Sequence, residues 1–146
     1  MNVILDAPAC SPVKQTAAPV NPPRILVVDD DVHLRRLEAD LLKSAGHRVE
    51  TAEDGLKAWQ VLQSRVYDLL VTDFSMPGLS GLALVHLLRR ASIALPVVMV
   101  SGALDSLDIE GLTRDPWARI HAFVRKPFTR PELLLAVSRA LTPESL

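Results

Sequence analysis

The fold of this chain is decided by the stretch "DLLVTDFSMPGLSG", which runs from Asp68 to Gly81. Its first half is a short apolar run that ends on a single carboxylate, Asp73, and its second half breaks at a Met-Pro-Gly sequence. A continuous apolar run of this length is typical of a strand buried on both faces. Pro77 presets its own φ angle and Gly78 accepts a positive one, so the pair indicates a turn. The stretch therefore predicts a buried strand that presents Asp73 at its carboxyl end.

Four further apolar runs alternate with amphipathic segments along the chain. The additional strands are predicted at "RILVVD" (24–29), "RVETA" (48–52), "PVVMVSG" (96–102) and "AFVRK" (122–126). Helices are predicted after the first strand, over 54–64, from the Ser80 cap to Arg90, and from the Thr129 capping box to about Leu141. Strands that alternate with helices predict an α/β fold, a doubly wound five-stranded parallel sheet covered on both faces.

The sequence also predicts which face of the first helix is buried and the character of the segment between the last two strands. In the first helix Leu34, Leu37 and Leu41 recur at i, i+3 and i+7, with Glu38 among the polar residues opposite, so we expect the three leucines to face the core. Between the last two strands, at 103–121, Gly111 and Pro116 interrupt the apolar pattern. This predicts a short or irregular fourth helix.

Composition excludes several classes of function. The chain has 146 residues, 49% of them hydrophobic, which is enough for one domain with a sizeable core. Its 16 basic and 17 acidic residues leave a net charge of −1, which argues against a nucleic-acid or membrane surface. Cys10 is the only cysteine, and neither a secretory signal nor a long apolar run is present, so we expect a cytoplasmic protein. Residues 1–23 hold five of the eleven prolines and predict a flexible leader before a folded domain at 24–146.

Polar residues gather at the predicted carboxyl ends of the strands, where parallel sheets bind ligands. They are Asp29, Asp30 and Asp31, then Asp73, then Ser101 with Gly102, and finally Arg125 with Lys126. Two carboxylates about 4 Å apart repel by roughly 4 kcal/mol at an effective dielectric of about 20. A hard divalent cation such as Mg²⁺ relieves that repulsion. With the Lys126 ammonium and the Ser101 hydroxyl added, the set predicts a phosphoryl site in which Asp73 is the nucleophile.

Asp31 has an alternative interpretation, because an acidic residue directly before a helix often serves only as the N-cap of that helix. We favour the cap for Asp31, since it directly precedes Val32 at the start of the predicted helix.

Four blocks, "ILVVDDD", "DLLVTDFSMPGLSG", "VVMVSG" and "FVRKPF", together resemble the signature blocks of response-regulator receiver domains from two-component signalling. The resemblance covers about residues 24–142 and implies a flavodoxin-like sheet order of 2-1-3-4-5. It implies that Asp73 accepts a phosphoryl group from a histidine kinase or a His-containing phosphotransfer protein. It also implies that Mg²⁺ is held directly by Asp30, Asp73 and the Ser75 carbonyl, with Asp29 acting mainly through water.

The resemblance assigns roles to three more residues. Ser101 stands at the switch hydroxyl position and Lys126 at the phosphate-binding lysine, and the Lys126–Pro127 bond is expected to be cis. Phe123 stands at the aromatic switch position, which is often Tyr. Because Phe123 has no hydroxyl, its coupling to Ser101 would rest on packing alone.

Three functions remain open at this stage. The first is a stand-alone receiver that signals through a partner protein or relays phosphate, with no conventional enzyme activity beyond Mg²⁺-dependent phosphorylation and dephosphorylation of Asp73. The second is a phosphorylation-independent protein-binding module. The third is an aspartyl phosphatase of the D-x-D-x-T type, although His33 stands where the Thr belongs. In addition, the last helix carries two adjacent apolar stripes, one of which could form a homodimer face.

Overall fold

The fold is a five-stranded, wholly parallel sheet with helices on both faces. The computed structural model describes residues 21–102, 110–112, 114–115 and 118–142. The strands are β1 (Arg24–Val28), β2 (Arg48–Ala52), β3 (Leu69–Asp73), β4 (Val97–Ser101) and β5 (Ala122–Arg125). The helices are α1 (Val32–Ser44), α2 (Gly55–Ser64), α3 (Gly81–Arg90) and α5 (Arg130–Leu141). The sheet order is β2-β1-β3-β4-β5, which confirms the predicted fold class and strand order.

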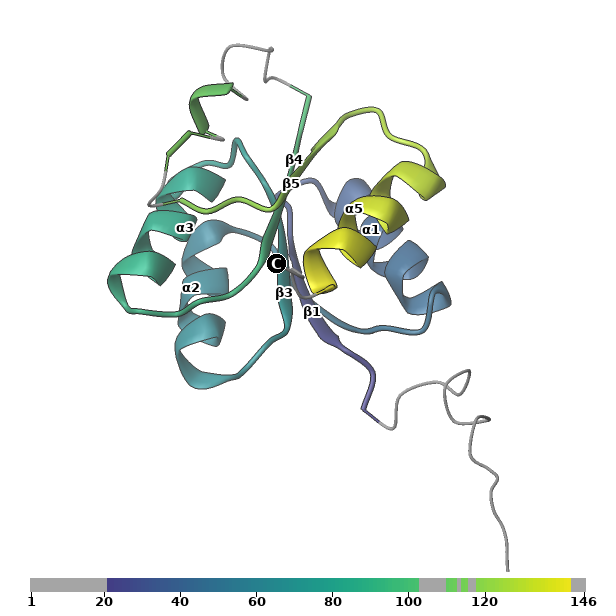
Figure 1. The fold of residues 1–146 in the computed structure, drawn as a ribbon, viewed down its shortest axis with the longest axis horizontal. Helices are drawn as coiled ribbons and strands as arrows, with labels where there is room; N and C mark the ends of the chain where they lie inside the picture. Colours follow the sequence, from purple (N-terminus) through teal and green to yellow (C-terminus); the bar gives the residue numbers. More distant parts are fainter. Residues whose placement is uncertain (1–20, 103–109, 113, 116–117, 143–146) are drawn as a thin grey trace, which may run out of the picture.

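The helices form two layers, with α2 and α3 on one face of the sheet and α1 and α5 on the other (Figure 1). Each layer encloses its own hydrophobic cluster, because alternate residues of a strand point to opposite faces. In β1, Leu26 and Val28 belong to the cluster that includes Leu84 and Leu88 of α3. The cluster on the other face contains Ile25 and Val27 of β1 together with Leu42 of α1 and Leu133 of α5. The sheet core is therefore buried on both sides, as its apolar strands require.

Polar caps fix where the helices begin. The Asp31 carboxylate accepts hydrogen bonds from the backbone N–H groups of His33 and Leu34 at 2.9 and 3.2 Å, so the N-cap reading is confirmed. Ser80 caps α3 in the predicted way, and Thr129 forms the predicted capping box with Glu132 at the start of α5. These caps place the first turn of each helix directly after a strand or its connecting loop.

The prediction for the inward face of α1 was wrong. Leu37 has 45% of its surface exposed, whereas Glu38, Ala39 and Leu42 are buried. Successive helix residues are about 100° apart, so the face has turned by roughly one residue from the predicted one. Leu41 lies at the boundary and packs against the cluster from the side. The sequence pattern of α1 was ambiguous because the helix carries apolar residues on two adjacent faces. Glu38 can be buried because the polar residues at the carboxyl end of the sheet lie next to it.

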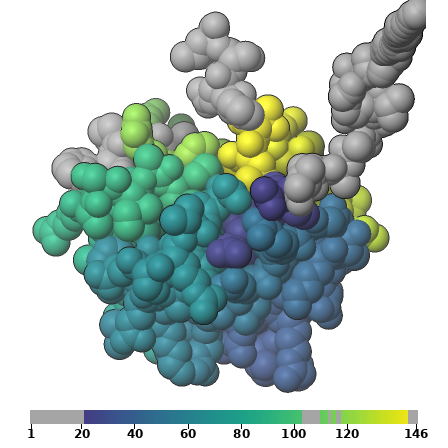
Figure 2. Space-filling view, turned by 90° about the horizontal axis from the view of Figure 1, so that it is seen from below, coloured from purple at the N-terminus to yellow at the C-terminus, as the bar shows by residue number. Residues whose placement is uncertain are grey.

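The amino end of β1 lies between the starts of β2 and β3. The Pro23 carbonyl accepts from Arg48 N at 3.0 Å, and the Arg24 carbonyl accepts from Asp68 N at 2.8 Å. Figure 2 shows the molecule from below, and there the purple segment lies at the surface next to the blue and teal segments that follow it in the chain. The strand begins at Arg24 as predicted. The leader was predicted over residues 1–23, of which 1–20 lie outside the described part of the chain.

The segment between β4 and β5 is described only in parts. Residues 110–112 are helical, which agrees with a short helix, and the rest of that prediction falls mostly on residues outside the described ranges. Arg89 of α3 ties the end of this segment to the domain, because its guanidinium donates to the carbonyls of Ala118 and Ile93 at 3.1 and 2.9 Å. Among the described residues, no helix is both long and apolar enough to pass through a bilayer.

The rotated face of α1 can be tested with two substitutions. Leu42→Ala removes a fully buried side chain and should lower the free energy of unfolding by about 2–5 kcal/mol in urea titrations. Leu37→Ala removes a half-exposed side chain and should cost less than about 1 kcal/mol. If the two substitutions lowered the free energy of unfolding equally, or if Leu37→Ala lowered it more, the result would support the inward face predicted from the sequence.

Candidate functional site

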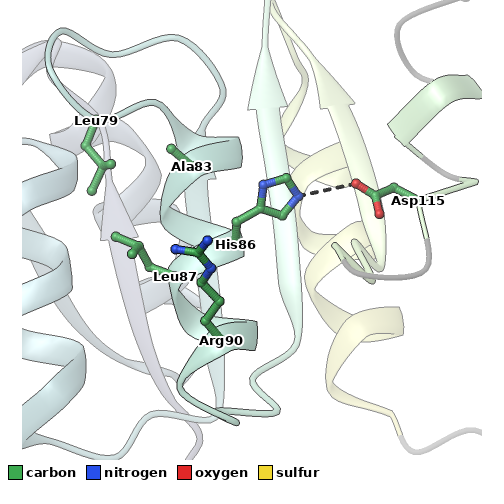
Figure 3. Close-up of a pocket in the computed structure, with 6 residues that line it drawn as sticks. All are labelled: Leu79, Ala83, His86, Leu87, Arg90 and Asp115. Carbon is green, nitrogen blue, oxygen red and sulfur yellow. Dashed lines mark hydrogen bonds and ion pairs between the residues drawn. The ribbon is translucent and has the colours of Figure 1, made fainter.

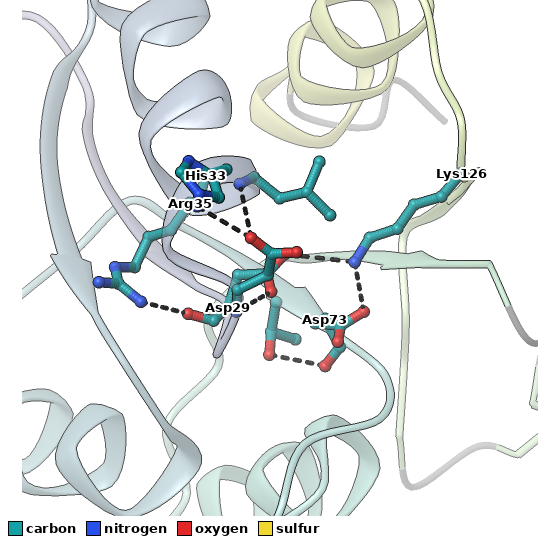
Figure 4. A network of polar contacts seen from close by, with 8 residues as sticks. Asp29, His33, Arg35, Asp73 and Lys126 are labelled. Atoms are coloured by element: carbon teal, nitrogen blue, oxygen red, sulfur yellow. Dashed lines mark hydrogen bonds and ion pairs between the residues drawn. The ribbon is translucent and has the colours of Figure 1, made fainter.

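Three strand ends bring an ammonium group and two carboxylates together. Asp29 follows β1 and Asp73 ends β3, and these strands are neighbours in register, with Val28 opposite Thr72. Lys126 follows β5, two strands away from β3. Its long side chain nevertheless brings Nζ to 3.0 Å from Asp73 Oδ1 and 3.2 Å from Asp29 Oδ2 (Figure 4). The parallel topology thus assembles groups that are 97 and 53 residues apart in sequence.

Asp30 completes a cluster of three acids. Asp29, Asp30 and Asp73 each offer a carboxylate oxygen, and these oxygens all lie within 4.8 Å of one another. Asp29 and Asp73 are buried, whereas Asp30 is exposed, so the cluster opens to solvent on the Asp30 side. Mg²⁺ takes oxygen ligands, needs only one or two carboxylates and keeps several waters. The donor set and its open side therefore fit a magnesium ion, which receiver domains in general bind at such an aspartate cluster.

The charges of the site are only partly balanced within it. Burial raises the pKa of Asp73, and the hydrogen bond and charge of Lys126 act in the opposite direction without cancelling the effect. Burial alone would lower the pKa of Lys126, but the contacts with Asp73 and Asp29 outweigh it and raise the pKa above its ordinary value. Lys126 therefore stays cationic, and one ammonium faces three carboxylates. An added cation would relieve the remaining repulsion.

Backbone and side-chain donors fix the position of Asp29. Its Oδ1 accepts from Asp31 N at 2.9 Å, and its carbonyl oxygen accepts from Arg35 Nη1 at 2.8 Å (Figure 4). The Asp73 carbonyl accepts in turn from the Thr72 hydroxyl at 3.0 Å. The sequence analysis did not identify Arg35 as a site residue, because it assigned Arg35 only to the polar face of the first helix. Its location one turn after the acid pair is the signal that could have identified it.

Two glycines shape the segment that follows Asp73. Gly78 has a φ angle of +83°, as expected for the Met-Pro-Gly turn, and Ser75 is exposed within the same loop. Gly81 then donates from its backbone N to Phe74 O at 2.9 Å. A Cβ atom at Gly81 would lie only 2.1 Å from the carbonyl oxygen of Asp73. The close approach of α3 to Asp73 therefore requires a residue without a side chain at position 81. The spacing of residues in the sequence could not show this requirement.

The predicted switch residues occupy neighbouring strands. Ser101 ends β4 with 3% of its surface exposed, and its carbonyl accepts from Lys126 N at 3.0 Å. Phe123 pairs with Met99 in the sheet and packs, partly buried, against the cluster beneath α2 and α3. The Lys126–Pro127 bond is cis, as expected. Ser101 lies opposite Arg125 in the sheet, so coupling by packing between Ser101 and Phe123 stays a prediction.

A fourth carboxyl group borders the site from within the core. Glu38 of α1 is only 1% exposed, and the charges of Asp29, Lys126 and Asp73 act on its carboxyl. Burial, followed by the negative charge of Asp29, raises the pKa of Glu38 to about 8. Its Oε2 atom has no hydrogen-bond partner among the described residues. Sequence reasoning placed Glu38 on the solvent side, so this neighbour of the acid cluster was missed.

A hollow beside α3 is separate from the acid cluster. A cavity of about 620 Å³ is lined by Leu79, Ala83, His86, Leu87, Arg90 and Asp115 (Figure 3). His86 Nε2 lies 3.3 Å from Asp115 Oδ2 across its wall. The lining is mostly the outer side of α3, and none of the clustered acids contributes to it.

Comparison with known sequences identifies the family. The sequence model of the family described as "Response regulator receiver domain" matches residues 25–138. The chain belongs to this family. It is a receiver domain of two-component signalling, with the strand-end acids in the arrangement described above.

Solved receiver domains have the same fold as this one. The receiver domain of NtrX from Brucella abortus is 37% identical, with a TM-score of 0.71 over 80% of this chain and 97% of that one. The receiver domain of the Francisella response regulator 1452 is 30% identical, with a TM-score of 0.74 over 82% and 96%. The chemotaxis protein CheY4 of Vibrio cholerae is 27% identical, with a TM-score of 0.75 over 82% and 99%.

Two curated relatives are much longer proteins. The gliding motility regulatory protein of Myxococcus xanthus is 41% identical over 80 residues, which are 53% of this chain and 10% of that protein. The sensor histidine kinase RcsC of Salmonella typhimurium is 43% identical over 77 residues, which are 53% of this chain and 8% of that protein. This chain therefore matches a tenth or less of either relative.

The close contact at Gly81 predicts an unusual effect of alanine. Alanine normally favours a helix over glycine, yet Gly81→Ala should lower the free energy of unfolding by about 1–3 kcal/mol because its Cβ overlaps Asp73 O. Gly111→Ala is the matched control, since a Cβ there meets nothing within 4 Å. Denaturant unfolding of both variants measures the effect, and a Gly81→Ala protein as stable as the wild type would disprove the constraint.

Proposed function

We propose that this receiver domain takes a phosphoryl group onto Asp73 from a phosphohistidine of a histidine kinase or His-phosphotransfer protein, in the presence of Mg²⁺. The observation that carries the proposal is the Lys126 ammonium 3.0 Å from Asp73 Oδ1, inside a half-buried acid cluster that opens to solvent at Asp30. A carboxylate placed beside fixed positive charge is suited to attack a phosphorus atom whose oxygens also need that charge.

The transfer is a single displacement at phosphorus. An oxygen of Asp73 forms the new bond, the P–N bond to the imidazole breaks, and its electron pair stays on the imidazole nitrogen. The product is an acyl phosphate on Asp73 and a histidine that has lost its phosphoryl group. Lys126 can then turn its ammonium from the carboxylate to the phosphoryl oxygens without leaving the pocket, because its Nζ already lies between two acids.

The acids divide the work of holding the metal. Asp30 and Asp73, with the Ser75 carbonyl, are the proposed direct ligands of Mg²⁺, and Asp29 acts mainly through water. When bound, the ion places positive charge against the phosphoryl oxygens. Asp29 is fully buried and held by Asp31 N, which keeps its carboxylate pointed at Lys126. Loss of the phosphoryl group reverses the state, with water as the attacking group.

The signal leaves the site through Ser101 and Phe123. The Ser101 hydroxyl donates to the new phosphoryl oxygens, and the shift at the end of β4 changes the packing of Phe123 on the adjacent strand. The altered surface then binds a downstream protein, or the phosphoryl group passes to a further histidine. The near-neutral charge of the chain supports a protein partner in the cytoplasm over nucleic acid or a membrane surface.

Three other predictions remain to be compared with the structure. The complete set of acids and lysine gives no support to a phosphorylation-independent module or to a phosphatase with its nucleophile on β1. A homodimer through α5 stays a prediction. Both apolar stripes of that helix pack into the domain. Leu133, Ala136 and Ala140 of one stripe and Val137 of the other are buried, and Leu134 and Leu141 pack partly buried against the same cluster.

Intact mass spectrometry tests the proposed phosphorylation. Wild-type protein incubated with Mg²⁺ and acetyl phosphate should gain the mass of one phosphoryl group, and a chelator should abolish the gain. Asp73→Asn should gain none, because an amide is too weak a nucleophile to replace the carboxylate. Asp40→Asn, which removes an exposed carboxylate on α1, should be labelled like the wild type. An unlabelled wild type, or equal labelling of Asp73→Asn, contradicts the proposal.

A further inference from the structure

Another hollow lies at the opposite end of the sheet from the acid cluster. It has a volume of about 400 Å³ and is lined by Arg89, Ala94, Leu95, Pro96, Arg119 and His121. Residues 94–96 lead into the amino end of β4, whereas the acid cluster lies at the carboxyl ends of β1 and β3. The charged or titratable side chains of this lining are two guanidinium groups and an imidazole, and no described carboxylate belongs to it. The hollow therefore presents positive charge to a ligand.

Backbone carbonyls hold the guanidinium of Arg89 in place. Its Nε, Nη1 and Nη2 atoms donate to the carbonyls of Ala118, Ile93 and Arg119 at 3.1, 2.9 and 3.2 Å. An arginine has five N–H groups, so two of those on Arg89 have no acceptor among the residues that the structure describes. None of the three acceptors carries a full negative charge. The Arg89 cation is thus fixed in position without a described carboxylate as its counter-ion.

Arg119 adds a second guanidinium beside the first. Its side chain is exposed and forms no hydrogen bond or ion pair within the described part of the chain. Its φ angle is +52°, in the left-handed region that residues other than glycine rarely adopt. Burial lowers the pKa of Arg89, and the nearby positive charge of Arg119 lowers it further. The two like charges therefore repel, and an anion between them would relieve the repulsion.

His121 is held beside the start of β4 by two contacts with Val97. The backbone N–H of His121 donates to Val97 O at 2.8 Å, and its ring Nδ1 accepts from Val97 N at 3.4 Å. An imidazole that accepts at Nδ1 carries its hydrogen on Nε2 when it is neutral. The ring therefore brings an N–H group and no negative charge to the lining, and Ala94 and Pro96 add apolar surface.

We propose that this hollow binds a small phosphomonoester whose phosphate is held by Arg89 and Arg119. A phosphate dianion matches the charge of two guanidinium groups, and its three terminal oxygens suit the forked donors of arginine. A carboxylate has one negative charge and two oxygens, so it would satisfy only one of them. Small-molecule sites have volumes of about 300–1,000 Å³, so the hollow also has room for a small organic group against Ala94 and Pro96. The site is separate from Asp73 and does not depend on the function proposed above.

Nuclear magnetic resonance titrations of the full chain without Mg²⁺ test the proposed site. Inorganic phosphate should shift the backbone amide signals of Arg119 and His121 saturably, whereas sodium chloride at matched ionic strength should not. Glycerol 2-phosphate should bind at least as tightly as inorganic phosphate. Acetate should bind at least about tenfold more weakly, because it leaves one guanidinium without its charged hydrogen bonds.

Substitutions at Arg119 and Arg90 show whether binding depends on the lining. Arg119→Gln should weaken phosphate binding at least about tenfold, because charged hydrogen bonds are lost. Its fold should persist, since the side chain has no partner among the described residues. Arg119→Lys keeps the charge without the planar fork and should have an affinity between the two. Arg90→Gln is the matched control, because it removes an exposed arginine of α3 outside this lining and should leave the affinity unchanged.

Several results would overturn the inference. They are shifts that do not saturate, an Arg119→Gln protein that binds phosphate like the wild type, and an Arg90→Gln protein weakened as much as Arg119→Gln. Acetate binding as tight as that of phosphate, or a monoester that binds more weakly than the inorganic ion, would also contradict the ligand class. If Arg119→Gln failed to fold, Arg119→Lys would decide the question, since wild-type affinity in that variant would rule out the bidentate contact.

Discussion

The ammonium of Lys126, held between Asp73 and Asp29, is the interaction on which the rest of the structure depends. It joins the end of β5 to the ends of β1 and β3 and so crosses β4. Two buried carboxylates next to one another favour protonation of one of them. The hydrogen bond and charge of Lys126 oppose the rise in the pKa of Asp73, and the exposed Asp30 opens the acid cluster to solvent.

Tight backbone packing gives this charge cluster its geometry. Gly81 lets α3 start against the carbonyl of Asp73, and Arg35 and Asp31 hold the main chain and side chain of Asp29. These contacts involve three different helices or loops, so the acids are fixed by the close packing of the α/β layers and not by local turns alone. Where the cluster touches the core, α1 adds the carboxyl of Glu38 at a cost in stability. Sites that carry out chemistry often include such unfavourable groups.

Much of this arrangement could be predicted because parallel sheets place their carboxyl ends together. The apolar runs predicted five strands, and the acids after them predicted a cluster that the structure does bring together. The caps at Asp31, Ser80 and Thr129 were also readable, since each is a local hydrogen-bond pattern. The four blocks of sequence indicated the family, which comparison of the chain with known sequences then established.

The remaining features depend on contacts that no local pattern encodes. α1 carries leucines on two adjacent faces, so periodicity alone could not decide whether Leu37 or Leu42 enters the core. Glu38 was assigned to solvent for the same reason. The need for Gly81 arises from a carbonyl eight residues earlier, and it becomes visible only when β3 and α3 are placed together in space.

A crystal structure of the protein grown with Mg²⁺ and beryllofluoride would test the central claim most directly. Beryllofluoride mimics a phosphoryl group and should be bonded to an oxygen of Asp73, with Lys126 Nζ within hydrogen-bond distance of a fluorine atom. Asp30 should contact the metal, while Asp29 keeps its place beside Lys126. Beryllofluoride at another residue, or a Lys126 side chain turned away from it, would contradict the account.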